Sequence, residues 1–172
     1  FVEKTGNKLI QMPKKPKGAK WNEPPIEIDD MVYRYDGGGF RRPGSTQIFV
    51  LSSEGGTPRQ VSELNKNIRS IEWMSNDKVL FSANLSENSD FEPSNSDIYS
   101  LDVPSGEIKK LTERFGPDYA PKVSPDKKYI AYLGYDDKFL GYQQNSLYVM
   151  DANGDNIKLV SDGFDRNISN IN

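Results

Sequence analysis

Short apolar segments, separated by polar and turn-forming residues, are spread along the whole chain. No segment keeps apolar residues at helical spacing over about 11 residues, so the sequence predicts no long helix. The clearest segments are five or six residues long, are rich in Tyr, Ile, Val and Leu, and are bounded by Pro-Asp and Asn-Gly turn signals. They are Ala120–Ser124, Tyr129–Gly134, Ser146–Asp151 and Ile157–Ser161. This pattern predicts an all-β fold.

The same pattern recurs about every 50 residues, with matching strand candidates at residues 47–51, 97–101 and 146–150. Four strand candidates per repeat at a constant long period are typical of a β-propeller, in which each repeat forms one blade. A sandwich gives no reason for such repetition. We therefore predict a partial propeller of about three four-stranded antiparallel blades plus fragments of two more. The predicted blades lie near residues 21–62, 71–112 and 121–161, and the incomplete ones at 1–12 and 168–172.

Two kinds of connection separate the predicted strands. Between the third and fourth strands, Gly55-Gly56, Ser105-Gly106 and Asn153-Gly154 predict tight hairpins, because glycine readily adopts positive φ. Between the second and third strands the connections are longer than a hairpin needs. They span residues 36–46, 85–96 and 135–145. Corresponding loops of a propeller emerge on one face, so these loops are the expected place for binding residues.

Composition narrows the chemistry. The chain has 172 residues, a formal net charge of -3 and a pI of about 5.1. Nucleic acid and anionic membranes require clustered positive charge, and we interpret the basic run Lys14–Lys20 as a solvated connector. No apolar run approaches the roughly 18 residues of a membrane span. We therefore predict neither nucleic-acid nor membrane binding.

Cysteine and histidine are both absent, which excludes disulfides, thiolate ligands and a histidine general base within this chain. A cysteine-free chain tolerates either redox state, so the compartment stays open. Residues 151–162 loosely resemble a calcium loop, but Asn156 stands where glycine is required and Asp162 where glutamate is. Gly37–Gly39 lacks the lysine and the helix of a phosphate loop. We predict no metal and no cofactor.

Segments from nearly the whole chain, taken in order, resemble one family. They are Met12-Pro13, Lys17–Trp21, Pro24-Pro25, Val32–Gly37, Phe81–Asn84, Asn95–Tyr99, Gly116–Asp118, Ser124–Asp126, Ala131–Asp137 and Leu147–Asp151. Together they resemble the N-terminal propeller of prolyl-oligopeptidase-type (S9) serine peptidases, in the acylaminoacyl-peptidase and dipeptidyl-peptidase-like branch. The segments at 124–126 and 147–151 also resemble the WD40-like repeats of TolB-like propellers.

The resemblance implies a longer parent protein in which the propeller covers an α/β-hydrolase domain with a Ser-Asp-His triad. The propeller of this family admits peptides rather than folded proteins. This chain has no Gly-x-Ser-x-Gly motif and no histidine, so we interpret it as the non-catalytic, substrate-gating part of a serine peptidase. Its expected partners are its own C-terminal hydrolase domain and a peptide or acylated peptide. The alternative is a TolB-like module that binds proteins with no hydrolase attached.

Five loop residues are candidate substrate contacts. Arg41 and Arg42 suit a peptide carboxylate, because the guanidinium fork matches carboxylate geometry. Glu92 suits a peptide amino terminus, and Phe91 and Tyr142 suit the walls of a cleft. The alternatives stay open: the arginines can pair with acids of neighbouring loops, and the aromatic residues can pack to shape the loops.

A partial propeller leaves sheet faces that a closed ring would cover. Trp73 and its equivalents in the other repeats are predicted to pack against a neighbouring blade. Three and a half blades also leave open strand edges and apolar surface. We therefore expect the chain to be a piece of a longer protein, and to associate with itself or with another piece.

Overall fold

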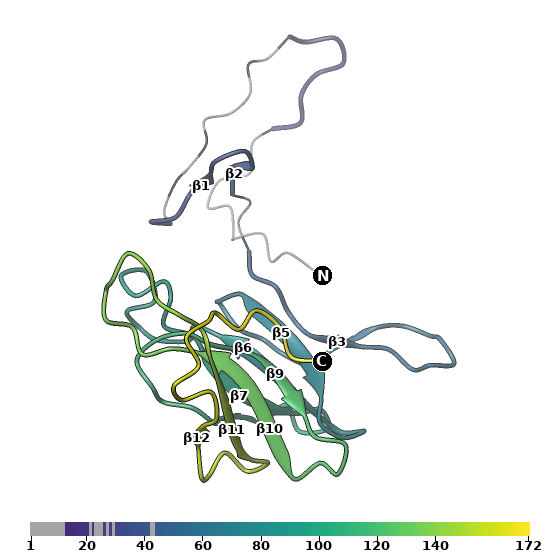
Figure 1. The fold of residues 1–172 in the computed structure, drawn as a ribbon. Helices are drawn as coiled ribbons and strands as arrows, with labels where there is room; N and C mark the ends of the chain where they lie inside the picture. The colour runs from purple at the N-terminus through teal and green to yellow at the C-terminus, as the bar shows by residue number, and fades with distance from the viewer. Residues whose placement is uncertain (1–12, 21, 23–25, 27, 29, 42–43) are drawn as a thin grey trace. The chain divides into compact units, whose positions relative to one another are not determined.

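The computed structural model describes residues 13–20, 22, 26, 28, 30–41 and 44–172 (Figure 1). The chain divides into two units, one of them Glu3–Gly44 and the other formed mainly by Ser45–Asn172. Every helix-or-strand element among the described residues is a β-strand, which confirms the all-β prediction. The predicted incomplete blade at residues 1–12 lies outside the described residues.

The first four-stranded sheet is antiparallel, and its strands neighbour one another in chain order as in a propeller blade. The strands are β5 (Ile68–Trp73), β6 (Lys78–Ala83), β7 (Asp97–Asp102) and β8 (Ile108–Lys110). β6 and β7 pair without interruption and are buried along most of their length. The register of β5 against β6 shifts between Arg69 and Glu72, where Ser70 has a φ of 48°.

The second four-stranded sheet repeats this arrangement. Its strands are β9 (Asp118–Val123), β10 (Tyr129–Gly134), β11 (Ser146–Asp151) and β12 (Lys158–Leu159). All four segments predicted as strands in this repeat are strands. The register shift between the first two strands also recurs. Here the β9–β10 register shifts between Ala131 and Leu133, and Ala120 has a φ of 52°. The repeat in the sequence is therefore a repeat in backbone geometry.

The described part of residues 21–62 differs from the two complete sheets. β3 (Phe49–Val50) pairs with β4 (Arg59–Gln60), while β1 (Arg34–Tyr35) pairs with β2 (Gly39–Phe40) in the other unit. Gly37 and Gly39 adopt positive φ values of 76° and 74°, so the chain turns back at once. The segment expected to open a long loop at residue 36 therefore forms a hairpin instead.

The sheet β5–β8 is covered on both faces. Because side chains alternate along a strand, Val79 and Phe81 of β6 point to one core and Leu80 to the other. Ile48 and Val61, which flank β3 and β4, join the first core. The second core contains residues of the sheet β9–β12: Ile130, Tyr132 and Met150. The sheets thus bury their faces against one another, as stacked blades do.

Trp73 corrects a sequence prediction, because it is 51% exposed rather than packed against a neighbouring blade. It pairs with Val79, so it shares the face that contacts the β3–β4 sheet. The β3–β4 sheet has only two short strands, and Trp73 lies on β5, at the opposite sheet edge from β8. The two-stranded β3–β4 sheet is wide enough to cover Val79 on β6 but does not reach Trp73 on β5, which stays exposed to solvent.

Candidate binding face

The antiparallel order of each blade places its longest loop and its connection to the next blade at one end. β6 and β8 run in the same direction, so the chain leaves both strands at the same end of the sheet. The same holds for β10 and β12. Figure 1 shows the loops after β6 and β10 projecting from this end. We call it the loop face, and define it as residues 63–67, 84–96, 113–117, 135–145 and 162–167.

The loop between β6 and β7 is folded by its own hydrogen bonds. The backbone amides of Phe91 and Glu92 both donate to the carbonyl of Asn88, at 2.9 and 3.0 Å. Asn84 Nδ2 donates to the Glu92 carbonyl at 2.6 Å, and Asn95 Nδ2 donates to the Glu92 carboxylate at 3.1 Å. These bonds fix the direction in which Phe91 projects, and its side chain stays 76% exposed.

The same loop is tied to both neighbouring connections. Lys66 lies 3.2 Å from the carboxylate of Asp90 in an ion pair. On the other side, the amide of Gly116 donates to Asn95 Oδ1 at 3.1 Å. Gly116 has a φ of 137° and would place a Cβ 2.9 Å from the Asp137 amide nitrogen, so this close approach requires glycine.

The loop between β10 and β11 is closed around Asp137. Its Oδ1 accepts hydrogen bonds from the Phe139 amide at 2.8 Å and from Gln143 Nε2 at 2.7 Å. The closed loop presents Phe139, Leu140 and Tyr142 to solvent, at exposed fractions of 80%, 61% and 75%. The Phe139 ring also lies 5.6 Å from the ring of Phe115 on the connection between the two blades.

The five candidate substrate contacts have different surroundings. Phe91, Glu92 and Tyr142 all belong to the loop face, although the Glu92 carboxylate already accepts a hydrogen bond from a neighbouring side chain. Arg41 belongs to the Glu3–Gly44 unit, where its guanidinium lies 3.8 Å from a carboxylate oxygen of Asp30. Arg42 lies outside the described residues. Phe115, Phe139, Leu140 and Phe164 are exposed on the loop face and were not singled out by the sequence.

A buried ion pair lies where the connection between the two complete blades meets β9. Arg114, in the connection after β8, pairs with the Asp118 carboxylate at the start of β9. Its other terminal nitrogen donates to the Tyr148 hydroxyl at 2.9 Å and lies 3.3 Å from Asp136. Asp118 is fully buried. Burial raises the pKa of Asp118 to about 6, against the lowering effect of the Arg114 guanidinium.

At each step between blades, a backbone amide donates a hydrogen bond to a residue shortly before the third strand of the preceding blade. The acceptor is a carbonyl in two cases and a threonine hydroxyl in the third. The Asp118 amide at the start of β9 donates to the carbonyl of Ser96, which precedes β7, at 2.7 Å. The Ile68 amide donates to Oγ1 of Thr46, which lies three residues before the start of β3, at 2.8 Å. The Ile168 amide donates to the carbonyl of Asn145, just before β11, at 3.2 Å. The chain at residue 168 therefore stands where the first strand of a further blade would begin.

Asparagine side chains support two of these contacts. Asn67 Oδ1 accepts from the Thr46 amide, and Asn167 Oδ1 accepts from the Asn145 amide, both at 2.9 Å. Each asparagine comes directly before the residue that makes the backbone contact. These two asparagines are 100 residues apart, which is two repeats, so the pair is visible in the sequence as a repeated position.

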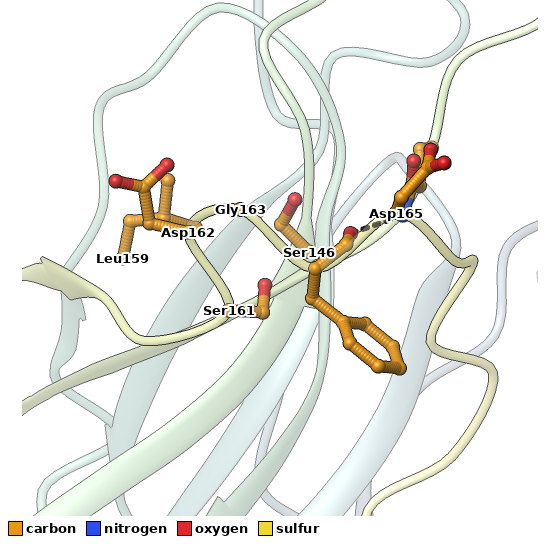
Figure 2. Close-up of a pocket in the computed structure, with 8 residues that line it drawn as sticks. Ser146, Leu159, Ser161, Asp162, Gly163 and Asp165 are labelled. Atoms are coloured by element: carbon orange, nitrogen blue, oxygen red, sulfur yellow. Dashed lines mark hydrogen bonds between the residues drawn. The ribbon is translucent and has the colours of Figure 1, made fainter.

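A shallow pocket of about 300 Å³ opens at the loop face beside β11. Its lining residues are Gln144, Ser146, Leu159, Ser161, Asp162, Gly163, Phe164 and Asp165. Figure 2 shows the side chains of Asp162 and Asp165 on either side of the two serines. Gln144 Nε2 donates to the Phe164 carbonyl at 2.7 Å and so helps to hold the connection that forms one wall.

The part of the chain that the structure describes has neither a candidate metal cluster nor a membrane-spanning helix. Nowhere in it do three or more Asp or Glu side chains gather in a way that suits a metal ion. It also contains no helix with the length and apolar character needed to cross a membrane.

Four-stranded sheets that are stacked face to face and joined in chain order, the first of them covered on both faces, define a segment of a β-propeller. Residues 38–139 match the family described as the dipeptidyl peptidase IV (DPP IV) N-terminal region. This match covers more than half of the chain, and the chain belongs to that family.

Solved structures of two other proteins show the same fold. A putative TolB from Agrobacterium tumefaciens aligns with a TM-score of 0.54 and 23% identity, over 70% of this chain and 39% of that one. TolB from Acinetobacter baumannii aligns with a TM-score of 0.53 and 20% identity, over 67% and 26%. The chain thus spans well under half the length of either protein. No curated protein matches the sequence.

Proposed function

We propose that this chain is the non-catalytic, substrate-gating propeller part of a serine peptidase that cleaves peptides or acylated peptides. The observation that carries the proposal is membership of the DPP IV N-terminal region family. The hydrolase domain that supplies the serine, aspartate and histidine is the proposed partner, because this chain contains no histidine.

The geometry of the loop face suits a gate. Its two long loops are held by internal hydrogen bonds and by contacts with the connections between blades, such as Lys66–Asp90 and Gly116–Asn95. Loops fixed in this way keep a constant position and leave large side chains such as Phe91 and Tyr142 exposed. An extended peptide can contact these side chains along its length, whereas a folded protein presents a convex surface and reaches few of them.

A second candidate function is a TolB-like module that binds other proteins and has no attached hydrolase. The observation that favours it is the likeness to two TolB structures. That likeness is below 25% identity and concerns the fold, whereas the family match covers residues 38–139 in sequence. We therefore place the peptidase propeller first.

Sequencing the gene that encodes this chain tests the choice directly. A downstream Gly-x-Ser-x-Gly motif between a strand and a helix, followed by an aspartate and a histidine in that order, is the expected result. An open reading frame that ends without such a domain would overturn the peptidase assignment and leave the TolB-like module.

In the full-length enzyme, gating has a separate test. Replacing residues 136–144 by a short Gly-Ser linker should raise cleavage of a folded protein substrate while cleavage of a five-residue reporter changes little. A linker of equal size in place of residues 52–57, in the β3–β4 hairpin at the other end of the blades, is the matched control. Equal effects of the two replacements would contradict the gate.

A further inference from the structure

The geometry points to a loop face that binds peptide segments carrying basic side chains next to bulky apolar ones. This inference rests on the proposed function, since it names the class of peptide that the same face would admit. It depends on three properties of the face: its net charge, the state of its few basic residues, and its exposed apolar side chains.

The loop face is much more acidic than the rest of the chain. Its five segments contain nine Asp or Glu residues and four Lys or Arg residues, a net charge of -5, whereas the whole chain has -3. All other residues together are therefore net positive. A surface on which one sign of charge is concentrated attracts ligands of the opposite sign and repels those of the same sign.

Two of the four basic residues of the face are already engaged within it. Lys66 pairs with Asp90 at 3.2 Å. Arg114 lies 3.3 Å from Asp136, pairs with the buried Asp118, and keeps only 19% of its side chain exposed. These two cations are thus paired with carboxylates, and the face keeps a net charge of -5 with Lys138 and Arg166 as its other basic residues.

Bulky apolar side chains are exposed among these carboxylates. Six of them are 40% exposed or more: Phe91, Phe115, Phe139, Leu140, Tyr142 and Phe164. Exposed apolar side chains gathered at one end of a protein mark an interaction surface. The aromatic faces also attract cations, which adds to the effect of the carboxylates.

The charge of the loop face indicates which class of ligand it can bind. Nucleic acid and an anionic membrane are repelled by a net charge of -5. A second copy of the chain would bring an equally acidic loop face, so face-to-face pairing is opposed. A peptide with lysine or arginine beside phenylalanine or leucine satisfies both the carboxylates and the exposed rings. The pocket between Asp162 and Asp165 has room for one such side chain.

Fluorescence anisotropy with the whole 172-residue chain tests the inference. The probe is a fluorescein-labelled, N-acetylated peptide of eight residues with three lysines and three phenylalanines. Two matched probes replace the lysines by glutamates or the phenylalanines by serines. The first probe should bind at least about tenfold more tightly than either other probe, and its affinity should fall with rising salt.

Substitutions locate the binding surface. Tyr142→Ser and Asp165→Asn should each weaken binding about threefold to tenfold, and neither side chain makes a hydrogen bond within the described residues that the fold would lose. The matched controls are Leu51→Ser and Glu107→Gln, which change exposed residues at the opposite end of the blades. Circular dichroism of each variant checks that the sheets remain folded.

Three results would overturn the inference: equal affinity for the three probes, equal weakening by the control substitutions, or a dimer that Tyr142→Ser dissociates. The last would mean that a second copy covers the loop face. The result of these binding measurements is independent of the test of the proposed function. An open reading frame without a hydrolase refutes the peptidase assignment but leaves measured binding standing, and absent binding leaves the assignment standing.

Discussion

Gly134, the last residue of β10, lies directly against Arg114, Pro117 and Asp118, which join the two complete blades. A Cβ at this position would lie 2.5 Å from Asp118 Oδ1 and less than 3 Å from Arg114 Nη2 and the Pro117 carbonyl oxygen. The backbone of Gly134 does not have positive φ, so alanine is compatible with the local conformation. The substitution Gly134→Ala therefore isolates the effect of the close approach from any effect of backbone strain.

The size of the effect follows from what must move. Asp118 is fully buried and the Pro117 oxygen belongs to the backbone, so the Arg114 guanidinium must shift and the start of β9 must also move away from β10. Overpacking alone costs about 1–3 kcal/mol, and breaking a buried ion pair costs about 3–5 kcal/mol. Because partial relaxation relieves some of both, we expect Gly134→Ala to lower the free energy of unfolding by about 3 kcal/mol.

Urea unfolding followed by far-ultraviolet circular dichroism measures this loss. Gly141→Ala is the matched control, because a Cβ there meets no atom within 4 Å and the backbone again lacks positive φ. The control should change the free energy of unfolding by less than about 0.5 kcal/mol. If Gly134→Ala proves as stable as Gly141→Ala, the close packing of Arg114 and Asp118 against β10 is refuted.

Three further predictions concern the chain alone. Burial raises the pKa of Asp118 in the folded state to about 6, from 3.8 for the free group. The free energy of unfolding should therefore fall as pH rises from 4 to 7, by up to about 3 kcal/mol from this group. Urea titrations at several pH values should show a smaller fall in Asp118→Asn. Equal slopes would contradict this. Incubation with acyl-peptide or dipeptide reporters should give no turnover, and activity that survives repurification would show otherwise. Sedimentation should reveal self-association through open blade faces, whereas a monodisperse monomer that resists proteolysis would argue against it.

Local chemistry explains what the sequence predicts well. The glycines assigned to hairpins between third and fourth strands have positive φ, among them Gly106 at 76° and Gly154 at 97°. The short runs rich in Tyr, Ile, Val and Leu also predict β10 and β11 with their observed bounds. Turn residues and strand-forming runs act over a few positions, so a single sequence reveals them.

Contacts between distant segments explain what the sequence does not show. Trp73 is a large apolar residue in a strand, and its exposure depends on how wide a sheet covers it. Arg114 and Asp118 are ordinary charged residues in the sequence, and only the approach of Gly134 shows that they are buried together. The projection of Phe139 likewise depends on how its loop closes around a carboxylate.

The recurring contact at Ile68, Asp118 and Ile168 places the joints between repeats 50 residues apart in each case. A duplication or deletion of one whole interval keeps the spacing between the remaining joints unchanged. Gene recombination can therefore change the number of repeats without disturbing how any two of them meet. A shift by a part of the interval would misalign the joint. Propellers with different numbers of blades can thus evolve by the gain or loss of complete repeats.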